Sequence, residues 1–236
     1  MIDLHSHILP GLDDGPDEMD GSIAIVKVLA ELGFVHLFAT PHHRLSTWRS
    51  LEPGVVEAGA MRLESFARKK GFSVQIHPGM EYDLDESMED RVADRPGNAG
   101  HVLVDLGFYH CPQNLAEMLA PVQKSGIQVI VVHPERNNDL LDEVDTMEAI
   151  EALGIRFLGN LGSLGGMYGK EIRRRGMRYL EGGRYWALAT DIHRARQAGL
   201  LERGMREAER IVGSEGMKRL LSEHPMDLVR GLEVNK

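Results

Sequence analysis

Short apolar runs alternate along this chain with longer stretches in which apolar residues recur at helical spacing. The short runs predict strands at 1–5, 35–40, 73–77, 101–106, 127–132, 155–159 and 186–190. Between them, the i, i+3, i+4, i+7 spacing of amphipathic helices is shown by Ile25, Val28, Leu29 and Leu32 and again by Leu115, Met118, Leu119 and Val122. Strands that alternate with helices pair in parallel through crossover helices, so the pattern predicts an α/β fold. It fits an open doubly wound sheet and a closed barrel equally well.

Polar side chains follow every predicted strand. In chain order they are His5 and His7, His42 and His43, Glu81, Asp105, His133, Asn160, and Asp191 with His193. Because the carboxyl ends of the strands of an α/β barrel meet on one face, we expect these side chains to form one cluster. His5 and His7 are two positions apart in an extended segment and therefore face the same way, as Asp191 and His193 do.

The candidate ligands are nitrogen and oxygen atoms, with no cysteine among them, which suits divalent Mn, Fe, Zn or Mg. About nine such residues are too many for one tetrahedral site and suit two or three ions. Arg136 stands three residues after His133, and its guanidinium is well shaped to contact phosphate oxygens. Clustered cations beside an arginine indicate hydrolysis of a phosphoester by metal-activated water.

Composition narrows the possible partners and compartment. The 236 residues carry a formal net charge of −9, which disfavours nucleic acid as a partner, and their length suits one domain spanning 1–236. The longest apolar runs are far below the roughly 20 residues of a membrane span, and the N-terminus does not read as a signal peptide. The single cysteine, Cys111, allows no intramolecular disulfide and fits a cytoplasmic location.

Two further features are interpreted as unrelated to catalysis. Cysteine-dependent tyrosine phosphatases need an arginine six residues after the cysteine, whereas Cys111 is followed at that spacing by Glu117. A basic run at 170–178 contains four arginines and is expected to be a solvated helix face.

Six segments carry a resemblance to a known family. They are 1–15 (Met-Ile-Asp-Leu-His-Ser-His-Ile-Leu-Pro-Gly-Leu-Asp-Asp-Gly), 39–43 (Ala-Thr-Pro-His-His), 79–81 (Gly-Met-Glu), 132–137 (Val-His-Pro-Glu-Arg-Asn), the loop 160–170, and 190–193 (Thr-Asp-Ile-His). Together they resemble the polymerase and histidinol phosphatase (PHP) superfamily. Within it they are most similar to the bacterial manganese-dependent protein-tyrosine phosphatases of capsule and exopolysaccharide synthesis.

The resemblance implies a fold, a site and a substrate. The fold would be a distorted TIM-like (β/α)7 barrel with a trinuclear centre, most readily of Mn. Carried over by position, the ligands would be His5, His7, Asp14, His42, Glu81, Asp105, His133, Asp191 and His193. The family usually has Glu at the position of Asp105. Arg136 and Arg196 would bind phosphate, and metal-bound water or His42 would protonate the leaving phenolate. The substrate would be the phosphorylated tail of a bacterial tyrosine kinase.

Three alternative functions stay open at this stage. A PHP-type phosphatase for a small phosphomonoester such as histidinol phosphate would keep the metal centre and change the pocket. A nuclease or amidohydrolase would use a similar barrel, but the negative net charge disfavours long nucleic acids. A catalytically silent domain would bind a partner and keep metal only for structure. Its mark would be missing ligand positions, and no position is missing here.

Overall fold

The computed structural model describes residues 1–43 and 51–234 and contains all seven predicted strands, each within two residues of its expected bounds. They are β1 (Ile2–Ser6), β2 (His36–Ala39), β4 (Gln75–Pro78), β6 (His101–Asp105), β7 (Gln128–Val132), β8 (Arg156–Asn160) and β9 (Ala187–Ala189). Two very short strands were not predicted, β3 (His42–His43) and β5 (Glu81–Asp83). Both carry candidate ligands.

All strand pairs are parallel, in the orders β1-β2-β4 and β3-β5-β6-β7-β8-β9. β3 continues the course of β2 after a two-residue break, and β5 continues that of β4 in the same way, so the two sheets are successive parts of one array. A bridge between Ser6 and Ile192 joins the first strand to the segment after the last one. The strands therefore run round a ring, and the predicted distorted (β/α)7 barrel is confirmed.

The joint between β1 and β9 uses a buried carboxylate as well as backbone pairing. Asp3 Oδ1 accepts a 2.9 Å hydrogen bond from Thr190 N, and Asp3 Oδ2 accepts a 2.6 Å bond from Thr190 Oγ1. One residue further on, Asp191 N donates to His5 O at 2.9 Å. A buried carboxylate is tolerated where donors satisfy its oxygens. The joint thereby fixes the backbone of two candidate ligands against each other.

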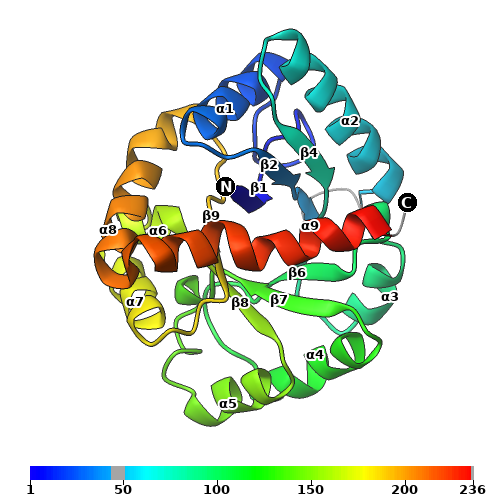
Figure 1. The fold of residues 1–236 in the computed structure, drawn as a ribbon. Helices are drawn as coiled ribbons and strands as arrows, with labels where there is room; N and C mark the ends of the chain where they lie inside the picture. Colours follow the sequence, from blue (N-terminus) through cyan, green and yellow to red (C-terminus); the bar gives the residue numbers. More distant parts are fainter. Residues whose placement is uncertain (44–50, 235–236) are drawn as a thin grey trace.

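Helices surround the strands on their outer side (Figure 1). They are α1 (Met19–Glu31), α2 (Pro53–Lys69), α3 (Met88–Ala93), α4 (Leu115–Lys124), α5 (Val144–Ala152), α6 (Leu161–Gly165), α7 (Lys170–Glu181), α8 (Ala198–Lys218) and α9 (His224–Val234). Ile25 and Leu29 of α1, and Leu115 and Leu119 of α4, are buried as the helical spacing predicted. Among the described residues, no helix combines the length and the apolar character that crossing a membrane requires.

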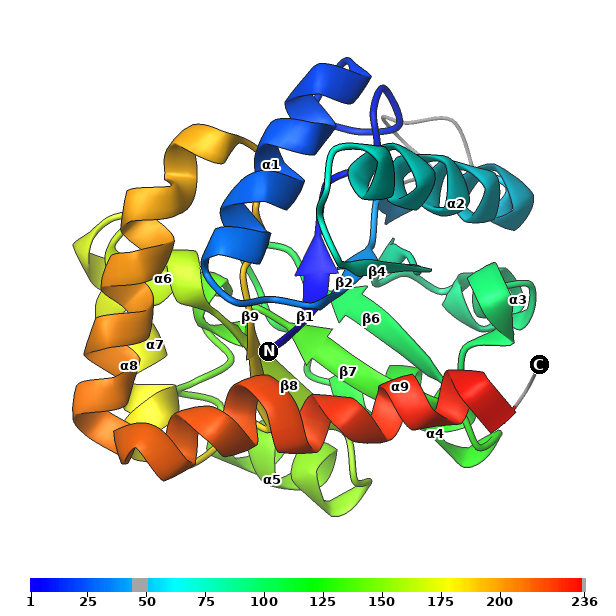
Figure 2. The same ribbon diagram turned by 45° about the horizontal axis from the view of Figure 1, so that its top comes forward.

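The two ends of the barrel differ in character. Its interior is an apolar cluster formed by Ile2, Leu4, Phe38, Leu103, Ile130, Val132, Leu158, Ala187 and Ala189. Helix α9 lies across the end where the strands begin (Figures 1 and 2), and its Val229 packs into this cluster. The barrel is thus filled and covered at that end, and the polar residues gather where the strands finish.

Helix α6 packs directly on α8 through two glycines. A Cβ on Gly165 would lie 2.0 Å from Leu200 O, and a Cβ on Gly204 would lie 1.9 Å from Leu161 O. Only glycine permits so close an approach of two backbones. The contact fixes the start of α6, and with it Asn160, at the edge of the barrel.

Part of the basic run in α7 is paired with acidic side chains at the surface, whereas the half-buried Arg175 donates from Nε to Glu135 O at 2.8 Å. Arg173 Nη2 lies 3.2 Å from Glu207 Oε2, and Arg178 Nη1 lies 3.4 Å from Asp142 Oδ1. This pairing is what a solvated helix face is expected to show.

Candidate metal centre

Nine histidine and carboxylate side chains lie together where the strands end. They form four overlapping groups, and within each group one ligand atom per residue lies within 4.8 Å of the others. The groups are His7, Asp14, His42 and His193; His5, His7 and Glu81; His5, His133 and Asp191; and Glu81, Asp105 and His133. The structure therefore brings together every residue that the resemblance implied as a ligand.

The two histidines at the end of β1 are each oriented through one ring nitrogen. His5 Nδ1 lies 2.7 Å from Thr40 Oγ1, and His7 Nδ1 lies 2.6 Å from Asp13 Oδ2. The Nε2 atoms of both rings are buried and have no hydrogen-bond partner among the described residues. A buried nitrogen without a partner is costly, and a metal ion would satisfy it. Support on the far nitrogen is usual for histidine ligands.

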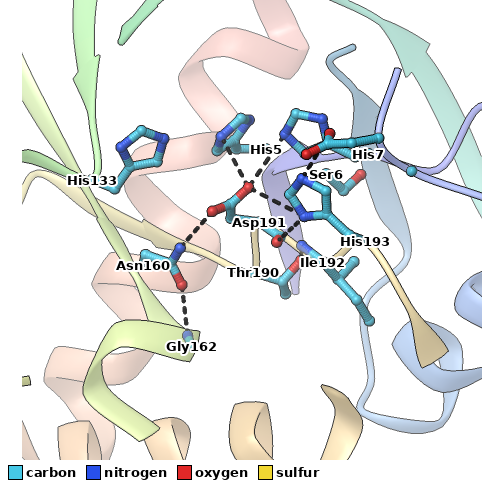
Figure 3. A network of polar contacts seen from close by, with 12 residues as sticks. His5, Ser6, His7, His133, Asn160, Gly162, Thr190, Asp191, Ile192 and His193 are labelled. Carbon is cyan, nitrogen blue, oxygen red and sulfur yellow. Dashed lines mark hydrogen bonds and ion pairs between the residues drawn. The ribbon is translucent and has the colours of Figure 1, made fainter. Parts of the chain in front are cut away.

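Asp191 divides its carboxylate oxygens between the cluster and its supports (Figure 3). Oδ1 lies 3.2 Å from His7 Nε2. Oδ2 accepts hydrogen bonds from Asn160 Nδ2 at 2.7 Å, from Arg136 Nη1 at 2.9 Å and from Tyr168 OH at 3.2 Å. The backbone of Asp191 has a φ of +50°, an unfavourable conformation for a residue with a Cβ. Strain of this kind is concentrated at functional sites.

Asn160 connects Asp191 to helix α6. Its Oδ1 accepts from Gly162 N at 2.6 Å and from Ser163 N at 3.2 Å, which caps the helix. Because the cap occupies the oxygen of the amide, its nitrogen is directed at Asp191, as Figure 3 shows. The contact between α6 and α8 therefore helps to position a candidate ligand.

Glu81 lies among four histidines at the start of β5. Its Oε1 is 2.9 Å from His133 Nε2 and 3.6 Å from His5 Nε2. Its Oε2 is 2.7 Å from His42 Nδ1 and 3.5 Å from His7 Nε2. The side chain is fully buried. A carboxylate with candidate ligands at both oxygens is well placed to bridge two ions.

Asp14 and Asp105 supply the remaining carboxylates. Asp14 Oδ1 lies 3.2 Å from His193 Nε2 and 3.4 Å from His42 Nε2, and its side chain is 54% exposed. Asp105 is buried, and its Oδ1 lies 3.9 Å from His133 Nδ1. Although its side chain is short, Asp105 belongs to one of the four ligand groups.

Burial and mutual charge set the protonation of the cluster. Burial lowers the pKa of His5 to about 3, which keeps its imidazole neutral. Burial alone would raise the pKa of Glu81 and of Asp191, but neighbouring histidines outweigh it, and the pKa of each carboxyl is well below its ordinary value. Neutral imidazoles and ionised carboxylates are the forms that bind divalent ions, so His5, Glu81 and Asp191 are already in the binding form. Burial would lower the pKa of His7, His42 and His133, but neighbouring carboxylates outweigh it and raise each pKa, so these rings would release a proton as an ion binds. The donor set fits divalent ions, with proton release on binding.

Arg136 lies beside the cluster between two aromatic rings. Its guanidinium carbon is 4.7 Å from the centre of the Phe108 ring and 4.5 Å from that of Tyr168. Stacking on aromatic faces and the bond to Asp191 hold the guanidinium in one place. An anion bound at the cluster would lie within its reach.

The other predicted arginine has a different position. Arg196 is exposed in a short 3₁₀ helix, Ala195–Gln197, while its neighbour Arg194 donates from Nη1 to Asp14 O at 2.7 Å. A role for Arg196 in binding phosphate stays a prediction. Burial raises the pKa of the Cys111 thiol to about 11, and a thiol of this kind is a poor nucleophile.

Sequence reasoning missed the residues that orient the candidate ligands. Thr40 contacts His5, Asp13 contacts His7, and Tyr168 contacts Asp191. Thr40 stands at the end of a strand, which was an available signal. Asp13 stands in the same segment, 1–15, as Asp14 but was not among the predicted ligands, and no pattern in the sequence identified Tyr168.

Comparisons with known proteins identify the family of this chain. The family model described as capsular polysaccharide synthesis, CpsB/CapC, matches residues 1–230. The tyrosine-protein phosphatase YwqE of Bacillus subtilis (strain 168) is 26% identical over 235 residues, which cover 98% of this chain and 92% of YwqE.

Solved structures show the same likeness. One comes from a study of YwqE from Bacillus subtilis and CpsB from Streptococcus pneumoniae, described there as unique metal-dependent tyrosine phosphatases. It has a TM-score of 0.89 at 26% identity and covers 98% of this chain and 95% of that one. A zinc complex of histidinol phosphate phosphatase from Lactococcus lactis has a TM-score of 0.57 at 11% identity, covers 87% of this chain and 93% of that one, and shares the fold alone. Since the family model covers nearly the whole sequence, the predicted family is confirmed, and the chain belongs to the CpsB/CapC family of capsular polysaccharide synthesis.

Proposed function

We propose that this chain is a metal-dependent tyrosine-protein phosphatase, the activity named for its relative YwqE. The observation that carries the proposal is the position of Arg136, whose guanidinium contacts Asp191 within the cluster of candidate ligands. A phosphoryl group at the cluster would meet clustered cations and this arginine together. Stabilising the charge of the transferring group in this way is the main task of a phosphatase site.

Two or three divalent ions would bind to the nine residues, most readily Mn, with Fe, Zn and Mg as alternatives. Four residues, His5, His7, Glu81 and His133, each belong to two of the four ligand groups, so they would contribute to holding more than one ion. The buried atoms His42 Nδ1 and Glu81 Oε2 lie 2.7 Å apart without the geometry of a hydrogen bond, and a bound ion would satisfy both, which supports this assignment. Bound ions supply an activated water and a clamp for the phosphoryl oxygens.

The protein's own groups bind and orient the substrate. Arg136 holds a phosphoryl oxygen, and its stack between Phe108 and Tyr168 means that little reorganisation is needed when charge develops. His42 has a carboxylate at each ring nitrogen, Glu81 at 2.7 Å and Asp14 at 3.4 Å. Burial would lower the pKa of His42, but Glu81 and Asp14 outweigh it and raise that pKa to about 9, so its two predicted roles, ligand and proton donor to the leaving phenolate, both stay predictions.

The alternatives are less well supported. The likeness to the histidinol phosphate phosphatase of Lactococcus lactis is confined to the fold, at 11% identity. A silent binding domain would be expected to lack ligands, whereas each candidate ligand lies in a group with its neighbours.

The test is phosphate release from a phosphotyrosyl peptide by purified protein, before and after chelation and with Mn, Fe, Zn or Mg added back. We expect activity to disappear with the chelator and to return best with Mn. Glu81→Gln should remove activity, because it takes one charge from the centre of the cluster. The matched control is Glu31→Gln, which changes an exposed carboxylate that pairs with Lys27 on α1.

Two outcomes would contradict the proposal. Activity that survives complete chelation would show that the cluster is not the catalytic centre. Rapid turnover of histidinol phosphate without turnover of the phosphotyrosyl peptide would transfer the assignment to the small-substrate alternative.

The cellular setting is proposed from the resemblance and the family name alone. The substrate would be the phosphotyrosine tail of a bacterial tyrosine kinase in the cytoplasm, and the process would be capsule or exopolysaccharide synthesis. These three statements stay predictions.

A further inference from the structure

The loop after β6 exposes two aromatic side chains next to the metal cluster. Phe108 is 40% exposed and Tyr109 is 74% exposed, and they follow the candidate ligand Asp105 by three and four positions. Large apolar side chains on a loop beside a polar site are typical of ligand contacts.

A cavity of about 300 Å³ lies along this loop, and we call it the ring slot. It is lined by Asp83, Leu84, Asp105, Leu106, Gly107, Phe108 and Tyr109. Its volume is at the lower end of the range for small-molecule sites, about 300–1,000 Å³, and leaves room for an aromatic ring. Asp105 belongs both to the slot and to a ligand group, so the slot opens beside the cluster.

We propose that the ring slot receives the aromatic ring of the phosphotyrosyl substrate while its phosphate lies at the metal cluster and Arg136. Phe108 links the two parts, because it lines the slot and also stacks on the Arg136 guanidinium at 4.7 Å. This inference rests on the proposed function and adds to it the residues that select an aryl ester.

Charge determines which part of the substrate enters the slot. Its lining contains two carboxylates, Asp83 and Asp105, and among the described residues that line it there is no Lys, Arg or His. An uncharged ring would gain contacts there with Phe108, Tyr109 and the leucines, whereas these lining residues offer a phosphate no cationic side chain. The phosphate is therefore directed to the side of the slot on which Arg136 lies.

The test compares two ligands that share a head group and differ only in the ring, phenylphosphonate and methylphosphonate. Their affinities for the full-length, Mn-loaded protein are measured by calorimetry. We expect the phenyl compound to bind more tightly. Tyr109→Ala and Phe108→Ala should each reduce the ratio of the two affinities about two- to tenfold, the effect of losing one aromatic contact. Phe66→Ala is the matched control, since Phe66 is 36% exposed on α2.

The two variants separate the slot from the arginine. Phe108→Ala also removes a stacking partner of Arg136, and this second effect would lower the affinities for both phosphonates equally. Among the described residues, the rings that stack on Arg136 are Phe108 and Tyr168, so Tyr109→Ala leaves this stacking unchanged. A smaller ratio in Tyr109→Ala thus supports the slot itself. Equal affinities in the wild type, or a ratio unchanged in both variants, would overturn it. If the wild type binds neither phosphonate and releases no phosphate from the peptide, the proposed function fails and the slot fails with it.

Discussion

Adjacent aspartates in the first loop are expected to have separate roles, and substitution can distinguish them. Asp13 is buried, lies 2.6 Å from His7 Nδ1 and accepts from His42 N at 3.2 Å, so it orients residues that would bind metal. Asp14 is more exposed and faces His193 Nε2 at 3.2 Å within a ligand group. Asp13→Asn should therefore weaken every contact that depends on His7, whereas Asp14→Asn should remove a ligand.

The size of the Asp13 effect follows from its contact with His7. Removing a carboxylate that orients a histidine ligand costs about 10- to 100-fold in metal affinity, or about 1.4–2.7 kcal/mol. At low pH, part of this loss in metal affinity is offset because the substitution also lowers the affinity of His7 for protons. Burial would lower the pKa of His7, but Asp13 outweighs burial and raises that pKa well above its ordinary value, so protons compete with the metal in the wild type. The advantage of the wild type should therefore grow as the pH rises.

The assay is calorimetric titration of metal-free protein with Mn at several pH values. Asp13→Asn should keep the wild-type number of bound ions at lower affinity, and Asp14→Asn should bind fewer ions. Thermal unfolding of both chelated variants is the control for loss of the fold. Wild-type affinity in Asp13→Asn at every pH would refute the orienting role. Loss of an ion in Asp13→Asn but not in Asp14→Asn would reverse the two assignments.

Three further changes test other parts of the molecule. Arg136→Lys keeps the positive charge but loses the planar guanidinium. We expect kcat/KM for a phosphotyrosyl peptide to fall about 100-fold while the metal content stays the same. Unchanged kinetics would contradict the role of Arg136 in binding the phosphoryl group. Asn160→Asp keeps the oxygen that caps α6, but it loses the donor to Asp191 and adds a charge that repels Asp191. Titration with Mn should therefore show about 10- to 100-fold weaker binding. Binding equal to that of the wild type would show that Asn160 does not support Asp191 as a ligand. His101 tests the effect of pH on stability. Burial, with a smaller effect of Arg95, lowers the pKa of its imidazole to about 4. Below about pH 6.5 the unfolded chain therefore binds a proton at His101 that the native state does not bind. Stability from this source is complete above that pH and falls by up to about 3 kcal/mol as the pH drops to 4. Urea unfolding of chelated wild type and His101→Gln should therefore show different slopes against pH, and parallel slopes would refute the effect.

Much of the site was predictable because parallel strands constrain where their ends lie. His5, Asp105, His133 and Asp191 each stand at or just after the end of an apolar run, and runs of that kind identified the seven main strands. The short strands β3 and β5 escaped prediction because their residues, His42–His43 and Glu81–Asp83, are mostly polar and too few to form a periodic pattern. Their pairing depends on neighbouring strands and not on their own sequence.

The direction of a side chain in a turn is not encoded in local pattern. Asp13 and Asp14 are the same residue type in the same loop, yet one is buried against His7 and the other is exposed. Gly15 shows the cause, because a Cβ there would lie 2.5 Å from His7 O. The turn packs directly on the end of β1, and this contact turns Asp13 inward. Such a contact becomes visible only when the backbone is in place.

Closing the barrel and assembling the site are the same structural event. The joint between Asp3 and Thr190 connects positions 187 residues apart. The candidate ligands lie just beyond it, His5 in β1 and Asp191 in the segment after β9. Ions held by residues of both segments would therefore cross-link the first strand to the last, so that part of the energy of metal binding would be folding energy. The opposite end of the barrel needs no such cross-link, because Val229 of α9 packs into an apolar interior there. One end of the barrel is stabilised by the burial of apolar side chains. The other end brings together carboxylates and histidines, and their attraction to one another and to bound ions would offset the cost of burying these charges.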